Sequence, residues 1–331
     1  MKIVAWLTTL LLAAPAGAMA WDGHDRLTRL ALADVAWLDS LPPVLVTTRT
    51  DRVSEIRQDY AFPYKGERQG DHLTARSILE RYAMEPDDGP DQELRVSWQQ
   101  RFMGGYTGMS SRGYFHMYYP SWTVHFPLPA TAMGAAPERA ALWCEAAKAA
   151  LARGDTYWGL RYLACAMHYV EDLGQPYHAT QTSTRFVVPT SPIAGTTKVT
   201  SNYHLAYEAW IARRVAEDTL ELGQTLRGID LEKFDDPGDA VRRVARKAHE
   251  QSGRLFGACI EFFGDRFHQP VDVPATEADL ARMEPAGPRD RMIAATRPAL
   301  ALTARAIRGF LEPLRPAIQF SVLEGARRPR P

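Results

Sequence analysis

The stretch from His168 to His178 constrains this 331-residue chain more than any other part of its sequence. Large apolar side chains precede it at helical spacing, so the sequence predicts a helix that reaches into the stretch. His168 and Asp172 are four residues apart and therefore lie on one face of that helix. Gly174 and Pro176 are typical of a helix end, after which the chain turns and presents His178. Two imidazoles and a carboxylate so arranged are suitable zinc ligands.

A single His-x-x-x-Asp pair on a helix is more often a surface hydrogen bond than a metal site. The other histidines of the chain favour a metal here. A second pair, His204-x-x-x-Glu208, follows in another predicted helix. Trp21, His24 and His116 also occupy settings suited to ligands, although a buried core histidine is the alternative for His116.

The stretch resembles the core motif of the zinc-dependent phospholipase C and single-strand-specific nuclease superfamily, which is His-Tyr-x-x-Asp-x-x-x-Pro-x-His. The matching residues are His168, Tyr169, Asp172, Pro176 and His178. The resemblance extends from Trp21 to about Trp210, and the last third of the chain carries no motif of this kind.

The resemblance implies three zinc ions and a set of ligands for each. One ion would be held by Asp87, His116, His168 and Asp172, a second by His178, His204 and Glu208, and a third by His24, Asp172 and the free amine and carbonyl of Trp21. Asp172 would therefore bridge two ions. Asp87 is matched from the acidic turn 85–91, where Asp88 and Asp91 are the alternative ligands and a solvated turn is the alternative interpretation.

The first twenty residues have the pattern of a signal peptide. Lys2 precedes an apolar run, and Ala18-Met19-Ala20 forms a small-residue cleavage site. Cleavage after Ala20 would make Trp21 the first residue of a secreted or periplasmic protein. A retained anchor is the alternative, but the apolar run is too short to span a bilayer.

Charge is balanced in the expected mature chain. The sequence has 39 Lys and Arg against 39 Asp and Glu, and loss of Lys2 leaves 38 against 39, a net charge of −1. No general basic field attracts a long polyanion, which disfavours binding to duplex nucleic acid.

The pattern as a whole predicts an all-α fold, because no segment of useful length alternates with the period of a strand. We expect one compact multi-helix domain over residues 21–320, with the metal cluster at one end of its central helices and a disordered tail at 321–331. Helices are predicted at 71–83, 137–152, 202–220, 239–263 and 290–314, and residues 181–201 are expected to have little structure. Cys144 and Cys165 are either paired or buried thiols.

The resemblance therefore implies a zinc-dependent phosphodiester hydrolase, in which Asp87 and Asp172 are the catalytic carboxylates of the zinc cluster. In the family that the chain resembles, phospholipase-type members typically carry Glu at the last zinc ligand and nuclease-type members Asp, so Glu208 favours a phospholipase C-like enzyme. The apolar residues 186–188 form a lip that could lie against a lipid surface, which favours a phospholipid substrate and peripheral membrane contact. A nuclease acting on single-stranded nucleic acid is the alternative enzyme, and a secreted helical protein with one structural zinc is the alternative of another class. No obligate protein partner is evident.

Overall fold

A computed structural model of the protein describes residues 23–56, 66–88, 113–120, 132, 134–180, 193–217, 221–228, 232, 234 and 236–327. The predicted signal peptide, Trp21, Asp91 and the lip at 186–188 lie outside these residues, and the side chain of Asp88 is not described. Within the described part, no helix combines the length and the apolar character that crossing a bilayer requires.

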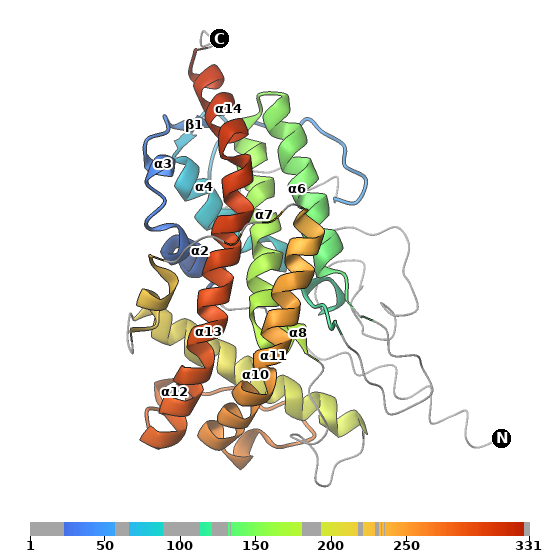
Figure 1. Ribbon diagram of the computed structural model, residues 1–331, viewed down its shortest axis with the longest axis vertical. Helices are drawn as coiled ribbons and strands as arrows, with labels where there is room; N and C mark the ends of the chain where they lie inside the picture. The colour runs from blue at the N-terminus through green and yellow to red at the C-terminus, as the bar shows by residue number, and fades with distance from the viewer. Residues whose placement is uncertain are drawn as a thin grey trace, which may run out of the picture.

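The fold is all-α, which confirms the prediction of the fold class (Figure 1). Its α-helices are α2 (His24–Leu32), α3 (Ala36–Asp39), α4 (Ala75–Tyr82), α6 (Ala136–Ala152), α7 (Thr156–Gly174), α8 (Pro176–Ala179), α10 (Ile193–Ala216), α11 (Pro237–Phe263), α12 (Glu277–Ala281), α13 (Ala286–Leu311) and α14 (Arg315–Arg327). Short 3₁₀ helices are η1 (Glu85–Asp88), η2 (Gly113–His116), η4 (Gly223–Leu226), η5 (Asp265–Phe267) and η6 (Glu312–Leu314). Strands β1 (Val44–Leu45) and β2 (His72–Leu73) form one antiparallel pair, too short to show an alternating pattern in the sequence.

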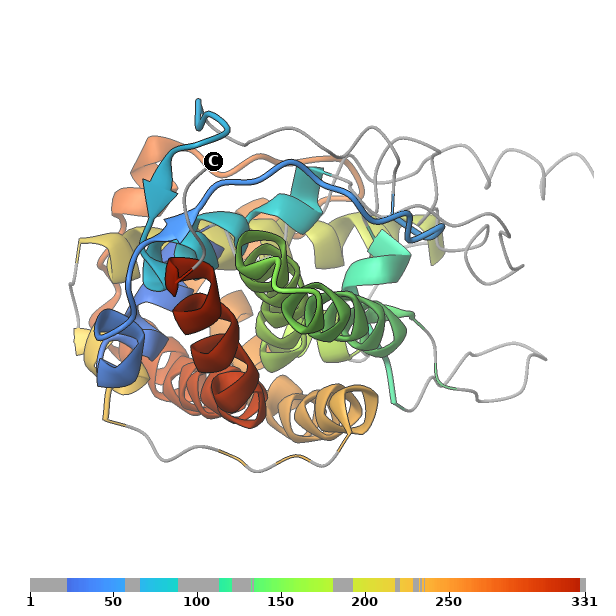
Figure 2. The same cartoon turned by 90° about the horizontal axis from the view of Figure 1, so that it is seen from above.

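Helix α7 is the centre of the bundle. It packs against α4, α6, α11 and α13, which surround it in both views (Figures 1 and 2). All 19 of its residues are buried, as expected for a helix that is apolar on nearly every face. The side chain of Asp155 accepts a hydrogen bond from the Trp158 amide and caps the first turn. The helix ends at Gly174, as predicted, but Pro176 begins the short helix α8 where the sequence predicted only a turn.

Helix α10 begins earlier than predicted. The expectation that residues 181–201 have little structure is wrong for 193–201, which form the first turns of this helix. Asn202 does not open the helix. Its side-chain amide donates to the carbonyls of Phe267, Gln269 and Val271, and its oxygen accepts from the Val273 amide. Tertiary packing therefore overrides the weak helix propensity of the Thr- and Ser-rich segment.

The predicted disordered tail is also wrong over residues 321–327, because α14 continues to Arg327. Ser321 and Val322 are buried, and the Ser321 hydroxyl lies 2.7 Å from that of Thr156 at the start of α7. Packing against α7 and α6 holds this part of the chain in place. Cys144 and Cys165 are buried free thiols, so of the two alternatives the unpaired one holds.

Candidate metal centre

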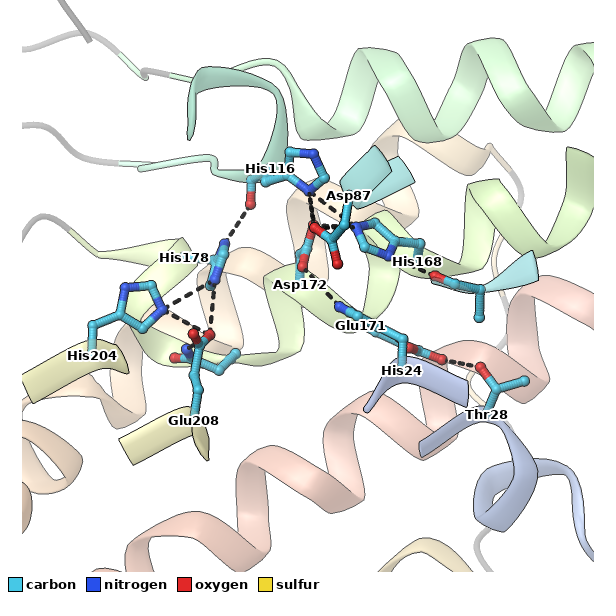
Figure 3. A network of polar contacts seen from close by, with 12 residues as sticks. His24, Thr28, Asp87, His116, His168, Glu171, Asp172, His178, His204 and Glu208 are labelled. Atoms are coloured by element: carbon cyan, nitrogen blue, oxygen red, sulfur yellow. Dashed lines mark hydrogen bonds and ion pairs between the residues drawn. The ribbon is translucent and has the colours of Figure 1, made fainter. Parts of the chain in front are cut away.

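The predicted ligands within the described residues converge at the C-terminal end of α7 (Figure 3). Helix α7 carries His168 and Asp172, α8 carries His178, and α10 carries His204 and Glu208. His24 opens α2, Asp87 lies in η1, and His116 ends η2. All of these residues are buried except Asp87, whose side chain is 13% exposed. Three groups among them place their ligand atoms close enough to hold a metal ion: His24, Asp87 and His168; His116, His168 and Asp172; and His178, His204 and Glu208.

The group around Asp172 is formed mainly by two histidines. Nδ1 of His116 lies 2.9 Å from Oδ2 of Asp172 and 3.0 Å from Nε2 of His168. His168 Nε2 is 3.3 Å from the same carboxylate oxygen. Asp87 Oδ1 lies further out, 3.8 Å from His168 Nε2 and 3.9 Å from His116 Nδ1. The structure therefore brings together the ligand set predicted for the first ion, with Asp87 at its outer edge.

The group around Glu208 lies at the end of the site formed by α8 and α10. Oε1 of Glu208 is 2.8 Å from His204 Nε2 and 3.2 Å from His178 Nε2. The two imidazole nitrogens are 3.2 Å from each other. His204 stacks on the ring of Tyr177 with centroids 4.9 Å apart, which fixes the plane of its imidazole. Gln175 donates to Glu208 Oε1 over 2.8 Å and supports the carboxylate from behind.

Backbone carbonyls determine which histidine nitrogens face the site. Nδ1 of His168 donates to the carbonyl of Ala83 over 2.7 Å, and Nδ1 of His178 donates to the carbonyl of His116 over 2.7 Å. Zinc binds the neutral imidazole, which has one N–H, so in that form Nε2 of each ring would present a lone pair to the site. Such a bond on the opposite ring nitrogen is the usual support of a histidine that ligates a metal.

The third part of the site joins α2 to α7. His24 Nε2 lies 3.5 Å from Asp172 Oδ1, and the His24 ring packs 4.0 Å from that of His168. Nδ1 of His24 lies 2.5 Å from Oε2 of Glu171, whose other oxygen accepts from the Thr28 hydroxyl. Because Trp21 lies outside the described residues, its predicted role as a ligand stays a prediction.

Burial and the opposed charges shift the pKa values of the site. Burial raises the pKa of Glu171, whereas for Asp172 the charges of His168 and His116 outweigh burial and hold its pKa well below the ordinary range. Burial lowers the pKa of His24. For His168 the opposite holds, because Asp172 and Asp87 outweigh burial and raise its pKa to about 9. Glu208 and Asp172 similarly raise the pKa of His178 to about 9.

Within the part of the chain that the structure describes, three buried polar atoms of the site have no hydrogen-bond partner: His24 Nε2, Asp172 Oδ1 and Glu208 Oε2. Such atoms are rare in folded proteins because each costs about 1–3 kcal/mol. All three belong to predicted ligands. A cation at the convergence of these donors would satisfy them, so the donor set fits a metal centre.

The sequence did not identify the residues that support the ligands, which include Glu171, Thr28 and Gln175. Glu171 carried a usable signal, since it is one of three charged residues in a mainly apolar helix, with Arg161 and Asp172, and directly precedes Asp172. Such a carboxylate needs a buried partner. No protein-family model matches the sequence, and no curated protein matches it either.

Proposed function

We propose that the protein is a zinc-dependent phosphodiester hydrolase of the phospholipase C type. The observation that carries this proposal is the pairing of two buried His and carboxylate groups, one around Asp172 and one around Glu208. The carbonyl of His116 accepts from Nδ1 of His178, and Nδ1 of His116 contacts Asp172, so the two groups share one residue. Two cations held by these neighbouring groups would match the arrangement used by many enzymes that hydrolyse phosphate esters.

Donor chemistry and spacing favour zinc. Imidazole nitrogen and carboxylate oxygen are its common ligands, at bonds of about 2.0–2.2 Å. A tetrahedron with such bonds has edges of roughly 3.3–3.6 Å. The separations between neighbouring donor atoms of the site run from 2.8 Å, for His204 and Glu208, to 3.9 Å, for His116 and Asp87. The edge of a zinc tetrahedron falls within this range. We therefore assign Asp87, His116, His168 and Asp172 to one zinc, His178, His204 and Glu208 to a second, and Trp21, His24 and Asp172 to a third.

A catalytic centre is favoured over a single structural zinc. Structural sites use four protein ligands, whereas catalytic sites keep one position for water or substrate. Within the described residues, the group of Glu208 offers three donors. Gln175 contacts Glu208 through its NH₂ group, which cannot ligate a cation in that orientation.

Zinc bound in this centre supplies a water whose pKa is lowered from 15.7 toward about 7 and neutralises charge on the phosphoryl oxygens. The residues of the chain provide the rest. Backbone carbonyls hold the Nδ1 atoms of His168 and His178, so both rings already point Nε2 at the site and need not rotate to bind a metal ion. Asp172 directs one oxygen to His116 and the other toward His24, which suits a bridging carboxylate. Asp87 lies at the partly exposed edge of the site.

The choice of phospholipid as substrate rests on two properties of the sequence. Glu208 is the residue typical of the phospholipase members of the family it resembles, and the nearly neutral mature chain lacks a field that would attract a polyanion. We propose a secreted or periplasmic location on the basis of the predicted signal peptide.

A substrate panel tests the proposal. Purified protein is assayed on phosphatidylcholine vesicles, other phospholipids, single-stranded DNA and single-stranded RNA, with and without chelator, and its zinc content is measured by atomic spectrometry. We expect two or three zinc ions per chain and chelator-sensitive release of diacylglycerol. Faster cleavage of single-stranded DNA or RNA would instead make the protein a nuclease, and one zinc without hydrolysis would make the site structural.

The amino-terminal ligand has its own test. A chain that begins with an uncleaved Met before Trp21 lacks the free Trp21 amine, so it should hold about one zinc fewer than the processed chain. The control is the same chain after the Met has been removed enzymatically. Equal zinc content and equal hydrolysis rates would remove Trp21 from the ligand set.

A further inference from the structure

Glu171 is a fully buried carboxylate that the ligand sets above do not use. Its two oxygens contact two side chains of α2. Oε2 lies 2.5 Å from Nδ1 of His24, and Oε1 accepts from the hydroxyl of Thr28 over 2.5 Å. His24 and Thr28 are four residues apart and lie on one face of α2. One carboxylate of α7 therefore binds two successive turns of α2.

The neighbouring residue, Asp172, faces the cluster instead. Consecutive residues on a helix point about 100° apart, so Glu171 turns to α2 while Asp172 turns to His116 and His168. Figure 3 shows the His24 ring between the two carboxylates, with Nδ1 at Glu171 and Nε2 toward Asp172. Both Nε2 of His24 and Oδ1 of Asp172 are buried without a hydrogen-bond partner among the described residues. The bond to Glu171 therefore decides which nitrogen of His24 faces Asp172.

We propose that Glu171 is a positioning residue that holds His24 in the tautomer with a bare Nε2 and so determines whether a metal ion is bound between His24 and Asp172. This inference rests on the proposed zinc centre. In this proposal, the ligands on α7, α8 and α10 bind their metal ions without Glu171, whereas the ion between His24 and Asp172 depends on the contact of α2 with Glu171. Carboxylates that support a ligating histidine in this way contribute 10–100-fold to metal affinity.

The experiment measures zinc affinity step by step, by competition with a chromogenic chelator. Glu171→Gln keeps the size of the side chain and replaces one of its two acceptor oxygens with an NH₂ group. We expect one zinc of this variant to bind about 10–100-fold more weakly, with the remaining zinc unchanged. Thr28→Val is the comparison variant, because it removes the other bond of Glu171 to α2 but leaves the His24 bond. It should lower the melting temperature and weaken zinc binding much less than Glu171→Gln does.

A double variant distinguishes positioning from a general effect on the fold. If Glu171 acts through His24, Glu171→Gln should cause no further loss of zinc in a His24→Ala background. An equal loss in both backgrounds, or wild-type affinities in Glu171→Gln, would overturn the inference while the proposed function stands. A wild-type chain that binds no zinc would overturn both.

The tautomer is measured on the wild-type protein and needs no variant. With ¹⁵N-labelled histidine, long-range ¹H–¹⁵N correlation should show His24 with a protonated Nδ1 and an unprotonated Nε2 when zinc is bound. Nε2 should lose its metal-bound shift when one zinc equivalent is removed. A protonated Nε2 in the zinc-loaded protein would show that Glu171 does not act in this way.

Discussion

The two halves of α7 both bury charged side chains, but they satisfy them differently. In the N-terminal half, Arg161 forms an ion pair with Glu85, with Nε 3.0 Å from Oε2, and its guanidinium lies over the rings of Tyr82 and Trp158 at 4.3 and 4.4 Å. The hydroxyls of Tyr82 and Tyr157 are 2.6 Å apart. In this network each buried charge faces a protein group of opposite charge.

In the C-terminal half, some buried polar atoms of the network lack a partner among the described residues, and we call this network open. Across residues 23–327, apart from the segments left undescribed, His24 Nε2, Asp172 Oδ1 and Glu208 Oε2 have no hydrogen-bond partner, and imidazole nitrogens face one another at 3.0 and 3.2 Å. Burial of charge therefore does not by itself mark a functional site. A closed network stabilises the fold, whereas an open one of convergent donors indicates a ligand.

The Arg161–Glu85 ion pair of the N-terminal half also positions part of the candidate metal centre. Glu85 and Asp87 lie on the same 3₁₀ helix, η1, so the ion pair with Arg161 holds η1 against α7. The carbonyl of Ala83, just before η1, accepts the bond from His168. The ion pair in the N-terminal half of α7 therefore helps to position Asp87 and the backbone partner of His168 at the candidate metal centre.

The largest effect is expected for Asp172→Asn, in the open half. Removing the proposed bridging charge should reduce hydrolysis by more than about a hundredfold, since even supporting residues contribute 10–100-fold to metal affinity. Helix content by circular dichroism should stay near that of the wild type. Full zinc content and full activity would show that Asp172 is not a ligand and would remove the functional contrast between the halves.

Arg161→Met tests the closed half. It leaves Glu85 buried without its cation, so the free energy of unfolding should fall by about 3–5 kcal/mol, measured by denaturant titration. The double variant Arg161→Met/Glu85→Gln removes the stranded charge and should recover much of this loss. The zinc held by His178, His204 and Glu208 should remain bound to the folded fraction. Loss of that zinc without loss of stability would contradict the division into two networks.

The pH dependence of stability and of zinc binding tests the same contrast, because His168 and His178 both belong to the open network. The pKa values of His168 and His178 are raised to about 9 in the folded, metal-free chain. The stability they contribute is therefore complete below about pH 6.5 and is lost as the pH rises through 9. Zinc requires neutral imidazoles, so binding at pH 7 should release about two protons, and affinity should rise about a hundredfold per pH unit up to about 8.5.

Calorimetry in buffers of different ionisation enthalpy counts the released protons, and thermal unfolding of the chelated protein follows its stability. A metal-free protein that becomes more stable from pH 6.5 to 9, or zinc binding without proton release, would contradict the raised pKa values.

The smallest effect is expected at the start of α7. Asp155→Ala removes the cap of Trp158 and the bond from Thr47, so stability should fall by about 1–2 kcal/mol. Zinc affinity should not change, because the cap lies at the far end of the helix. Loss of zinc in this variant would show that the two halves of α7 are coupled more strongly than their separate networks indicate.

Local patterns predicted much of the fold. The bounds of α6, α7 and α11 follow from apolar periodicity, Pro137, the Asp155 cap and Gly174, all of which act over a few residues. The start of α10 and the end of α14 did not follow, because each depends on partners distant in sequence. Asn202 is bonded to the segment 267–273, and Ser321 to Thr156.

The types of the candidate ligands and their spacing within each helix follow from the sequence alone. The spacing of His168 and Asp172, and of His204 and Glu208, puts each pair on one helical face whatever the tertiary structure, since four residues are about one turn. Three other relations depend on the tertiary structure. They are the approach of His24 to Asp172, the contact of Glu171 with α2, and the choice of the imidazole nitrogen that faces the cluster. Those relations depend on how separate helices pack and on which carbonyls they bring to each ring, and a periodicity within one helix cannot specify the angle between two.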